Sequence, residues 1–160
     1  MKTFAFARGS SGGRTYFVAL HSGDPPGESG WSEYVQAVSV GCGMASGTVH
    51  ILVVTDGGAP SAMQRRELAA TFDRAPLPPF AHVFSDDAFV RGVVTAFRWL
   101  ARTRFASHAP RDFVAVCADI GLAHEQVLYD FFAVQKTMSA VHTLRLVGES
   151  VVPARISLRS

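Results

Sequence analysis

Two polar turns in this sequence each follow an apolar run and lead into a segment with helical spacing. The apolar runs cover residues 48–55 and 80–84, and the turns carry serines and aspartates, with an arginine about one turn further on. Open parallel sheets bind ligands at the carboxyl ends of their strands, and helix N-termini favour anions through their unpaired N–H groups. These residues therefore predict a site for a small anionic ligand such as a phosphate or a carboxylate. The candidate binding residues are Asp56, Ser61, Arg65, Ser85, Asp86 and Arg91.

Ordinary helix capping explains several of the same residues. Ser61 precedes a helical segment with Gln64 three residues later, which is the capping-box pattern. An aspartate such as Asp86 at an N-cap stabilises a helix by about 1 kcal/mol, and Asp56 before two glycines is typical of an Asx turn. Ser61 is also a candidate phosphorylation site, because added negative charge is tolerated at a helix N-terminus. The sequence leaves the cap and the ligand site open as alternatives.

Metal and nucleophilic chemistry lack their sequence motifs. The histidines form no His-x-His or HExxH pattern, and His50 and His82 lie in apolar runs, which is typical of core or edge residues. Cys42 and Cys117 belong to no CxxC or Cys/His cluster, so we expect reduced, buried thiols. No nucleophile elbow is indicated, because the Gly-x-Ser-x-Gly string at Gly9–Gly13 joins two β-like runs rather than a strand and a helix, and the GxGxxG and P-loop patterns are absent. The sequence therefore predicts no catalytic residue, no metal site and no cofactor, and favours a non-enzymatic role.

Composition sets the broad class of protein. The chain has 160 residues, of which 48% are hydrophobic and 18% charged, with a formal net charge of +2. This is enough apolar material for one core in a single domain, and the balanced charge argues against nucleic acid as a partner. No apolar run approaches the ~20 residues of a membrane span, and Arg8 and Gly9 interrupt the apolar N-terminus too early for a signal peptide. We expect a cytoplasmic protein.

Hydrophobic periodicity predicts an α/β domain. Residues 3–8 and 14–21 are short β-like runs joined by a turn rich in glycine and serine, which predicts an N-terminal β-hairpin. Residues 48–55 are apolar on both faces, as in the central strand of a parallel sheet. Single amphipathic helices separate the strands, and the first of these is expected to end at Gly41 and Gly43. The predicted fold is a mainly parallel sheet of about four to five strands with amphipathic helices.

Helical spacing also selects the side chains expected to face the core. In the first three helices these are Trp31, Tyr34, Val35 and Val38, then Met63, Leu68, Ala69 and Phe72, then Phe89, Val90, Val93, Val94, Phe97 and Leu100. The opposite stripe of the third helix consists of Arg91, Arg98 and Arg102. That stripe could dock an acidic partner or be a solvated face, and Trp31 and Trp99 could be interface anchors or core residues.

The C-terminal third is expected to hold a short edge strand over 105–108 and two helices. The run 112–120 could pass for a buried strand, but its apolar residues keep helical spacing, so we predict a helix. One long helix is expected over 123–144. Residues 1–147 then form a single domain, and residues 148–160 form a tail that we expect to be flexible. The apolar seam of the long helix, which could also pair between chains, is Val127, Phe131, Val134, Met138 and Val141.

One part of the layout points to a known family. Over Phe80–Phe105 a strand is followed by Ser-Asp-Asp and an amphipathic helix with Trp-Leu near its end, and Pro110–Leu122 adds a short helix. With the opening hairpin, this layout of residues 14–145 resembles the STAS-like domains, the group named after the sporulation anti-anti-sigma factor. The resemblance places the family's regulatory serine within Asp56–Ser61, a segment without the family's Asp-Ser pair. It implies a regulatory or scaffold domain that acts through protein partners or as a dimer.

Three hypotheses about function follow from the sequence. The first is a regulatory or scaffold domain that works through protein–protein contacts. The second is a domain that binds a small ligand or anion at the carboxyl ends of the strands. The third is an oligomer-forming component that associates through its C-terminal helix.

Overall fold

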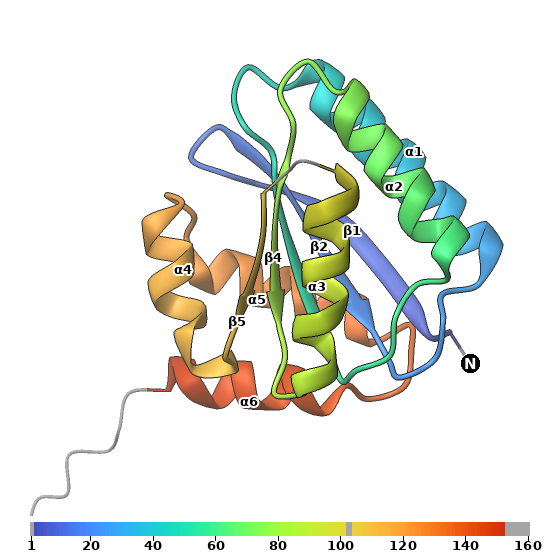
Figure 1. Cartoon of the computed structure of the whole chain (residues 1–160). Helices are drawn as coiled ribbons and strands as arrows, with labels where there is room; N and C mark the ends of the chain where they lie inside the picture. Colours follow the sequence, from blue (N-terminus) through green and yellow to red (C-terminus); the bar gives the residue numbers. More distant parts are fainter. Residues whose placement is uncertain (1, 102–103, 153–160) are drawn as a thin grey trace, which may run out of the picture.

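The computed structural model describes residues 2–101 and 104–152, in which a five-stranded sheet carries helices on both faces (Figure 1). The strands lie in the order of the chain; β1 is antiparallel to β2, and all other neighbours are parallel. This confirms the α/β class, the hairpin and the mainly parallel sheet. The strands are β1 (Phe4–Ser11), β2 (Arg14–His21), β3 (His50–Thr55), β4 (Phe80–Phe84) and β5 (Phe105–His108).

The hairpin is longer than its sequence pattern indicates. Strand β1 continues through Gly9 to Ser11, and it pairs with β2 from Phe4 opposite His21 to Ser11 opposite Arg14. The turn consists of Gly12 and Gly13 alone, at φ 55° and 76°. Positive φ at both positions is the requirement of a two-residue turn whose twist matches that of the strands. The extension reaches the start of α5 (His124–Gln135), where Ser11 Oγ accepts from Ala123 N at 3.1 Å.

The crossover helices α1 (Glu28–Met44), α2 (Ala62–Arg74) and α3 (Ala88–Ala101) pack on one face of the sheet. Crossovers of one hand between successive neighbouring strands place their helices on the same side. Helix α1 runs through Gly41 and Gly43, so the prediction that these glycines end it is wrong. A Cβ atom at Gly41 would lie 2.8 Å from the Phe17 ring, so this glycine allows α1 to approach β2 closely.

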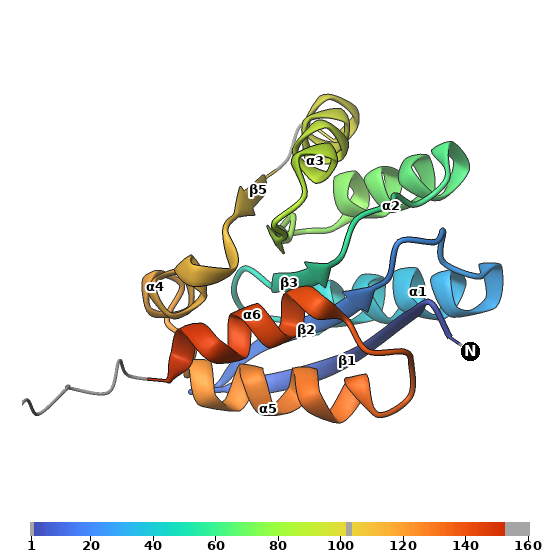
Figure 2. The same cartoon turned by 90° about the horizontal axis from the view of Figure 1, so that it is seen from below.

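The opposite face is covered by α4 (Phe113–Asp119), α5 (His124–Gln135) and α6 (His142–Val151), with a 3₁₀ turn at Pro110–Asp112 before α4 (Figure 2). The helix predicted over 112–120 is therefore confirmed, as is the edge strand before it. Leu52, Val54 and Phe84 are fully buried under these three helices.

The prediction of a single long helix over 123–144 is wrong, because the helix is interrupted between α5 and α6. The Gln135 side chain bridges the break: its Nε2 donates to Ser139 O at 2.7 Å, and its Oε1 accepts from Val141 N at 3.1 Å. Helix α6 then runs through the expected domain end at residue 147 to Val151. The rest of the predicted tail, residues 153–160, lies outside the described residues. The residues of the proposed seam are buried in the core of this chain: Val127, Phe131, Val134, Met138 and Val141.

Two helical core predictions are also wrong. Met63 is 79% exposed and Phe89 is 60% exposed, and each is the second residue of its helix, next to a buried one. Both cysteines are buried and free, as expected. None of the helices in the described part of the chain is both long enough and apolar enough to cross a membrane.

Candidate functional site

The six candidate binding residues do not form one site. Asp56 holds the start of α6: its Oδ2 accepts from His142 N at 2.8 Å and its Oδ1 from Thr143 N at 2.7 Å. Helix α6 has no cap from its own N-cap residue, Val141. The carboxylate of Asp56 therefore caps a helix that lies 86 positions further along the chain.

Ser61 and Arg65 act within the start of α2. Ser61 Oγ accepts from Gln64 N at 3.2 Å and Gln64 Oε1 accepts from Ser61 N at 2.8 Å, so the predicted capping box is confirmed. Arg65 Nη1 donates to Pro60 O at 2.6 Å. These contacts pair the polar groups of this turn with each other.

Ser85, Asp86 and Arg91 do come together, with His108, around a hollow of about 270 Å³. Asp87 lines the same hollow and caps α3, because its Oδ1 accepts from Phe89 N at 2.8 Å. Two carboxylates thus face one guanidinium here, and a carboxylate already binds the N–H groups at the helix start. This balance of charge does not favour an anion.

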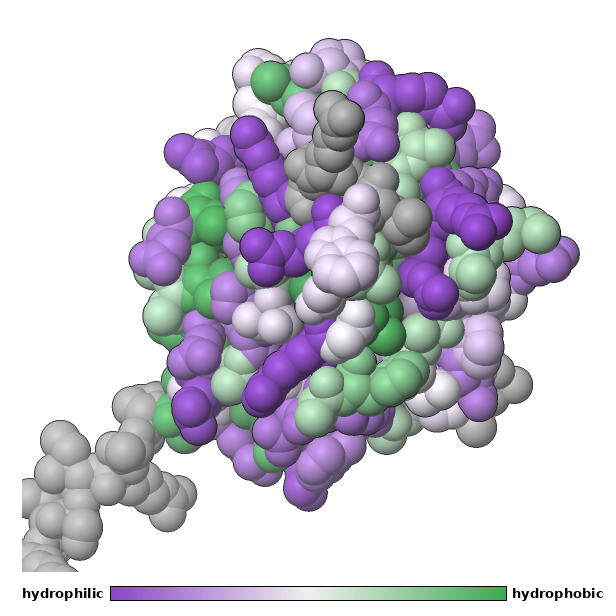
Figure 3. Space-filling view, viewed as in Figure 1, coloured by the Kyte–Doolittle hydropathy of each residue, from purple (hydrophilic) through white to green (hydrophobic). Residues whose placement is uncertain are grey.

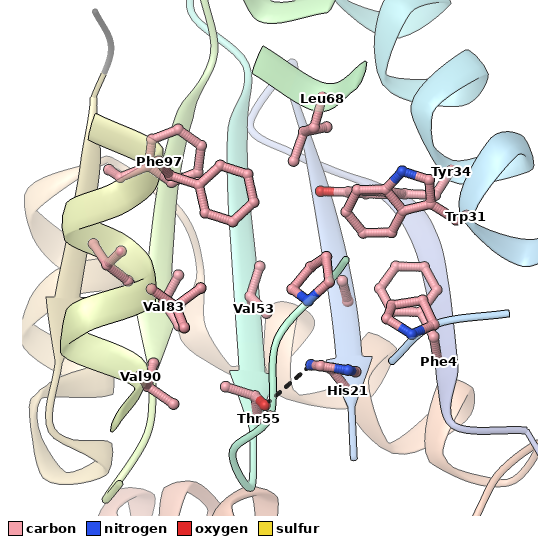
Figure 4. Close-up of a pocket in the computed structure, with 18 of the residues that line it drawn as sticks. Phe4, His21, Trp31, Tyr34, Val53, Thr55, Leu68, Val83, Val90 and Phe97 are labelled. Carbon is pink, nitrogen blue, oxygen red and sulfur yellow. Dashed lines mark hydrogen bonds between the residues drawn. The ribbon is translucent and has the colours of Figure 1, made fainter. Parts of the chain in front are cut away.

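A different feature is an apolar cleft between the sheet and helices α1–α3 (Figure 4). Its floor includes Val53 and Val83, which are half-buried although they lie on the two central strands. Their neighbours Leu52 and Phe84, on the opposite face of the same strands, are completely buried. The three helices therefore leave Val53 and Val83 partly exposed, and the cleft has a volume of about 70 Å³.

Side chains from all three helices form the walls of the cleft. Trp31 and Tyr34 come from α1, Leu68 from α2, and Val90 and Phe97 from α3 (Figure 4). Among the described residues that line the cleft there is no Asp, Glu, Lys or Arg. The full lining is Phe4, Ala19, His21, Pro26, Trp31, Tyr34, Val53, Thr55, Gly58, Pro60, Leu68, Phe72, Ala81, Val83, Val90, Val93, Val94, Phe97 and Phe105.

The polar end of the cleft is formed by His21 and Thr55, where β2 and β3 end. His21 Nε2 contacts the carbonyl oxygen of Asp24, which can only accept, so Nε2 carries the proton. His21 Nδ1 then accepts, and it lies 3.4 Å from Thr55 Oγ1. This hydroxyl also lies 3.1 Å from Gly57 O as a donor, and it accepts from Gly57 N at 3.1 Å. Burial lowers the pKa of His21 and keeps its ring neutral. Both ring nitrogens are therefore engaged within the chain.

The α1 wall supplies hydrogen-bond donors of a different kind. Trp31 is 3% exposed, and its buried Nε1–H has no hydrogen-bond partner within the described residues. The Tyr34 hydroxyl points into the cleft, toward the side where Leu68 lies (Figure 4). Burial raises the pKa of this hydroxyl, so it stays protonated and can donate.

A row of histidines crosses the other face of the sheet. His50 Nδ1 lies 3.2 Å from His82 Nε2, and His82 Nδ1 lies 3.1 Å from His108 Nε2. The strand register explains this diagonal, because His82 lies opposite Leu52, two residues beyond His50, and His108 lies opposite Phe84. The row therefore joins three adjacent strands through side chains.

The row is neutral. Burial, with the neighbouring His50 and His108, lowers the pKa of His82 to about 3. A neutral imidazole has one N–H, so His82 donates to one neighbour and accepts from the other. The two hydrogen bonds of the row therefore point in the same direction along it. Both ring nitrogens of His82 have partners without a ligand. The part of the chain that the structure describes contains no group of three or more His, Cys, Asp or Glu side chains that could hold a metal ion.

No family model, curated protein or solved structure matches the chain. The residues themselves are therefore the basis for inferring a function. The sequence placed Trp31 and Tyr34 correctly on the buried face of α1, but it carried no signal that one donor there would lack a partner. The polar His21 and Thr55 at the ends of two apolar strands were the available clue to the end of the cleft.

Proposed function

We propose that this protein binds a small, mostly apolar molecule in the cleft between the sheet and helices α1–α3. The observation that carries the proposal is the half-buried state of Val53 and Val83 in the centre of the sheet. Central strands are normally the best-covered part of a parallel sheet. Ligand sites are usually concave and lined mainly by hydrophobic and aromatic side chains with a few polar groups, as this cleft is.

The energetics favour an apolar occupant. Each methylene group that a ligand buries in such a cleft stabilises the complex by about 0.8 kcal/mol. The cleft volume of about 70 Å³ is smaller than a cavity of roughly 150 Å³ that holds benzene in another protein. A ligand larger than benzene therefore requires helices α1–α3 to move apart or extends out of the cleft toward solvent.

The test uses the neutral apolar dye N-phenyl-1-naphthylamine, whose fluorescence rises in apolar surroundings. We expect saturable binding to the wild-type chain. Val93→Phe adds bulk to the α3 wall and should weaken dye binding at least about tenfold, since it fills the space that the dye occupies. The matched control is Val40→Phe, the same change at a residue that is 51% exposed and does not line the cleft.

Dye binding that is absent, or that both variants weaken equally, would contradict the proposal. Circular dichroism of each variant establishes that it is folded. Ala81→Leu, which fills the cleft from the floor, provides a second blocking variant if Val93→Phe does not fold.

Protein contact through the outer face of α3 is the second candidate. Trp99 is 85% exposed and Phe89 is 60% exposed on this helix, where Arg91 and Arg98 are also exposed. Figure 3 shows apolar and strongly polar residues mixed over the side of the molecule that α3 occupies in Figure 1. Aromatic and arginine side chains together fit an acidic protein segment. This proposal continues the regulatory role that the STAS-like resemblance implies.

A poly-glutamate peptide that contains one aromatic residue other than tryptophan tests this candidate. Binding should change the fluorescence of the exposed Trp99, weaken as salt rises, and fall in the double variant Arg91→Gln, Arg98→Gln. The double variant Arg65→Gln, Arg66→Gln on α2 is the control with the same change in net charge. Equal binding by the two double variants would remove the candidate.

A further inference from the structure

We infer that the outer edge of strand β1 binds a second copy of this chain. The β1 strands of the two copies pair in the antiparallel direction, and the two five-stranded sheets join into one. This inference does not rest on the proposed function, because the interface lies at the edge of the sheet and not in the cleft under helices α1–α3.

The two outermost strands, β1 and β5, differ in how they resist pairing with another chain (Figure 2). Strand β5 has four residues, and a short edge strand offers little to a partner. Strand β1 has eight residues and pairs with β2 without a bulge. It contains no proline or lysine, which commonly protect an edge strand, and its single charged residue is Arg8. The β1 edge is therefore the one suited to pairing.

Alternate residues of β1 direct their backbone groups away from the sheet. Ser22 N donates to Thr3 O at 2.9 Å, and this places the bonds to β2 at the odd-numbered positions. The outward N–H and C=O groups belong to Phe4, Phe6, Arg8 and Ser10. Within the described residues these groups have no hydrogen-bond partner, so they are available to another strand.

A groove of about 460 Å³ leads to this edge along Lys2–Phe6. Its walls are the start of α1 and Thr137, which follows α5. An added Cβ at Gly27 or Gly30 in the α1 wall would meet no atom within 4 Å, so this wall leaves room for a strand. At Lys2 the edge already pairs with Met138 in a parallel bridge, which marks the end of the available edge.

The side chains of β1 are complementary to those of a second, antiparallel β1. The register that uses all four outward residues places Phe4 opposite the partner's Ser10 and Phe6 opposite the partner's Arg8. These side chains lie on the α1 face of the sheet, because Phe4 and Phe6 belong to the core under α1. The Phe6 ring then lies beside a guanidinium group, which is a favourable pair.

Charge on the groove wall favours the same partner. Glu33 is the one acidic residue among those that line the groove. Glu33 and Arg8 are both exposed, and in the part of the chain that the structure describes neither forms an ion pair. The partner's Arg8 enters on the face of the sheet where Glu33 lies, and two-fold symmetry repeats this pair. A second copy therefore supplies the charge that the groove lacks.

The helix on the other face of β1 allows the two copies to approach. Helix α5 packs on both β1 and β2, so its axis lies over the gap between these strands. With strands about 4.8 Å apart, the α5 helices of the two copies lie about 10 Å from each other. This is a normal packing distance for two helices.

Sedimentation velocity at chain concentrations from about 1 to 100 µM tests the inference, and we expect a reversible equilibrium between monomer and dimer. Ser10→Pro removes an outward N–H and leaves the bonds between β1 and β2 intact. It should raise the dissociation constant of the dimer at least about tenfold, since symmetry removes the hydrogen bond twice. Ser10→Ala keeps the N–H and is the matched control. Circular dichroism establishes that each variant is folded.

Charge reversal tests the pairing of Arg8 with Glu33. Arg8→Glu and Glu33→Arg each place like charges across the interface and should each raise the dissociation constant at least about tenfold. The double variant Arg8→Glu, Glu33→Arg should recover binding to within about threefold of the wild type. Glu67→Arg makes the same change at an exposed residue of α2 and should have no effect.

Amide hydrogen exchange locates the interface. In the monomer, the outward amides of Phe6 and Arg8 should exchange fast, and the amides of Ala5 and Ala7, which bond to β2, slowly. At concentrations at which the dimer forms, all four should exchange slowly.

A chain that stays monomeric at the highest concentration would overturn the inference. A dimer in which the Phe6 and Arg8 amides still exchange fast would also overturn it, because that dimer would form through another surface. Failure of the double charge variant to recover binding would contradict it as well. Dye binding in the cleft should be the same in Ser10→Pro as in the wild type, so this inference and the proposed function can fail separately.

Discussion

The two faces of the sheet are covered in different ways. On the α4–α6 face, Leu52, Val54 and Phe84 are fully buried, and the polar side chain in the middle, His82, is paired on both sides. On the α1–α3 face, Val53 and Val83 of the same strands are half-buried. The buried Trp31 N–H on that face has no partner. Helices α4–α6 therefore bury their face of the sheet fully, whereas helices α1–α3 leave two valines partly exposed and one buried donor unpaired.

Chain connectivity accounts for this difference. Helices α1, α2 and α3 are each joined at both ends to strands, so the positions of the strands fix their spacing. Helices α4, α5 and α6 follow the last strand and can pack wherever they bury most apolar surface. A binding site on the crossover face therefore requires no special fold, only helices that stay apart.

The largest expected effect comes from creating a cavity in the core under helices α4–α6, on the face that we call the closed face. Phe131 is fully buried and lies edge-on to Phe113 at 6.2 Å. Phe131→Ala should lower the free energy of unfolding by about 3–5 kcal/mol. Phe97→Ala, in the wall of the cleft, should cost less, because Phe97 borders the empty volume of the cleft and so has fewer packing partners on that side. Urea unfolding measures both, and equal losses would remove the contrast between the faces.

Two substitutions on β3 test the same contrast between the faces, because each adds a single methylene group to one of them. Val54→Ile adds it to the closed face, where we expect a loss of about 1–3 kcal/mol from overpacking. Val53→Ile adds it to the cleft, where stability should change by less than about 1 kcal/mol. The difference between the two urea midpoints is the quantity to compare. A larger loss for Val53→Ile would mean that the cleft is closed in solution.

Acid should weaken the histidine row on the closed face. The pKa of His82 is about 3 in the folded chain, against about 6.5 when unfolded. The unfolded state therefore binds more protons as the pH falls below 6.5. Stability is then lost progressively down to the folded pKa, by about 2 kcal/mol at pH 5 for this group.

His82→Gln removes this titration and keeps a side chain that can both donate and accept. The difference in unfolding free energy between pH 7.5 and pH 5 should shrink in this variant. It should remain unchanged in His124→Gln, where the ring lies near the surface beside Glu125. An unchanged difference in His82→Gln would show that the row does not control the acid sensitivity.

Sequence patterns predicted the closed face and the crossover helices well, because apolar periodicity reports which side of an element is covered. The strand 80–84 agrees with β4 at both ends, and the buried side of α1 was identified from Trp31 and its neighbours. The break after Gln135 was missed, because the apolar spacing continues across it to Val141. The cleft could not be predicted, since the distance between helices does not appear in the periodicity of any one of them.

Asp56 is a single residue whose contact could not be predicted from the sequence. Its substitution gives the smallest expected effect. Its position after a buried strand predicted a ligand site, whereas its carboxylate caps α6 on the closed face. Asp56→Ala should lower stability by about 1 kcal/mol and speed hydrogen exchange at the His142 and Thr143 amides. Asp86→Ala, an exposed acid in the next strand-end turn, is the control and should leave both unchanged. If Asp56→Ala preserved stability and amide protection, the capping contact would not form in solution, and a ligand role for this carboxylate would again need to be considered.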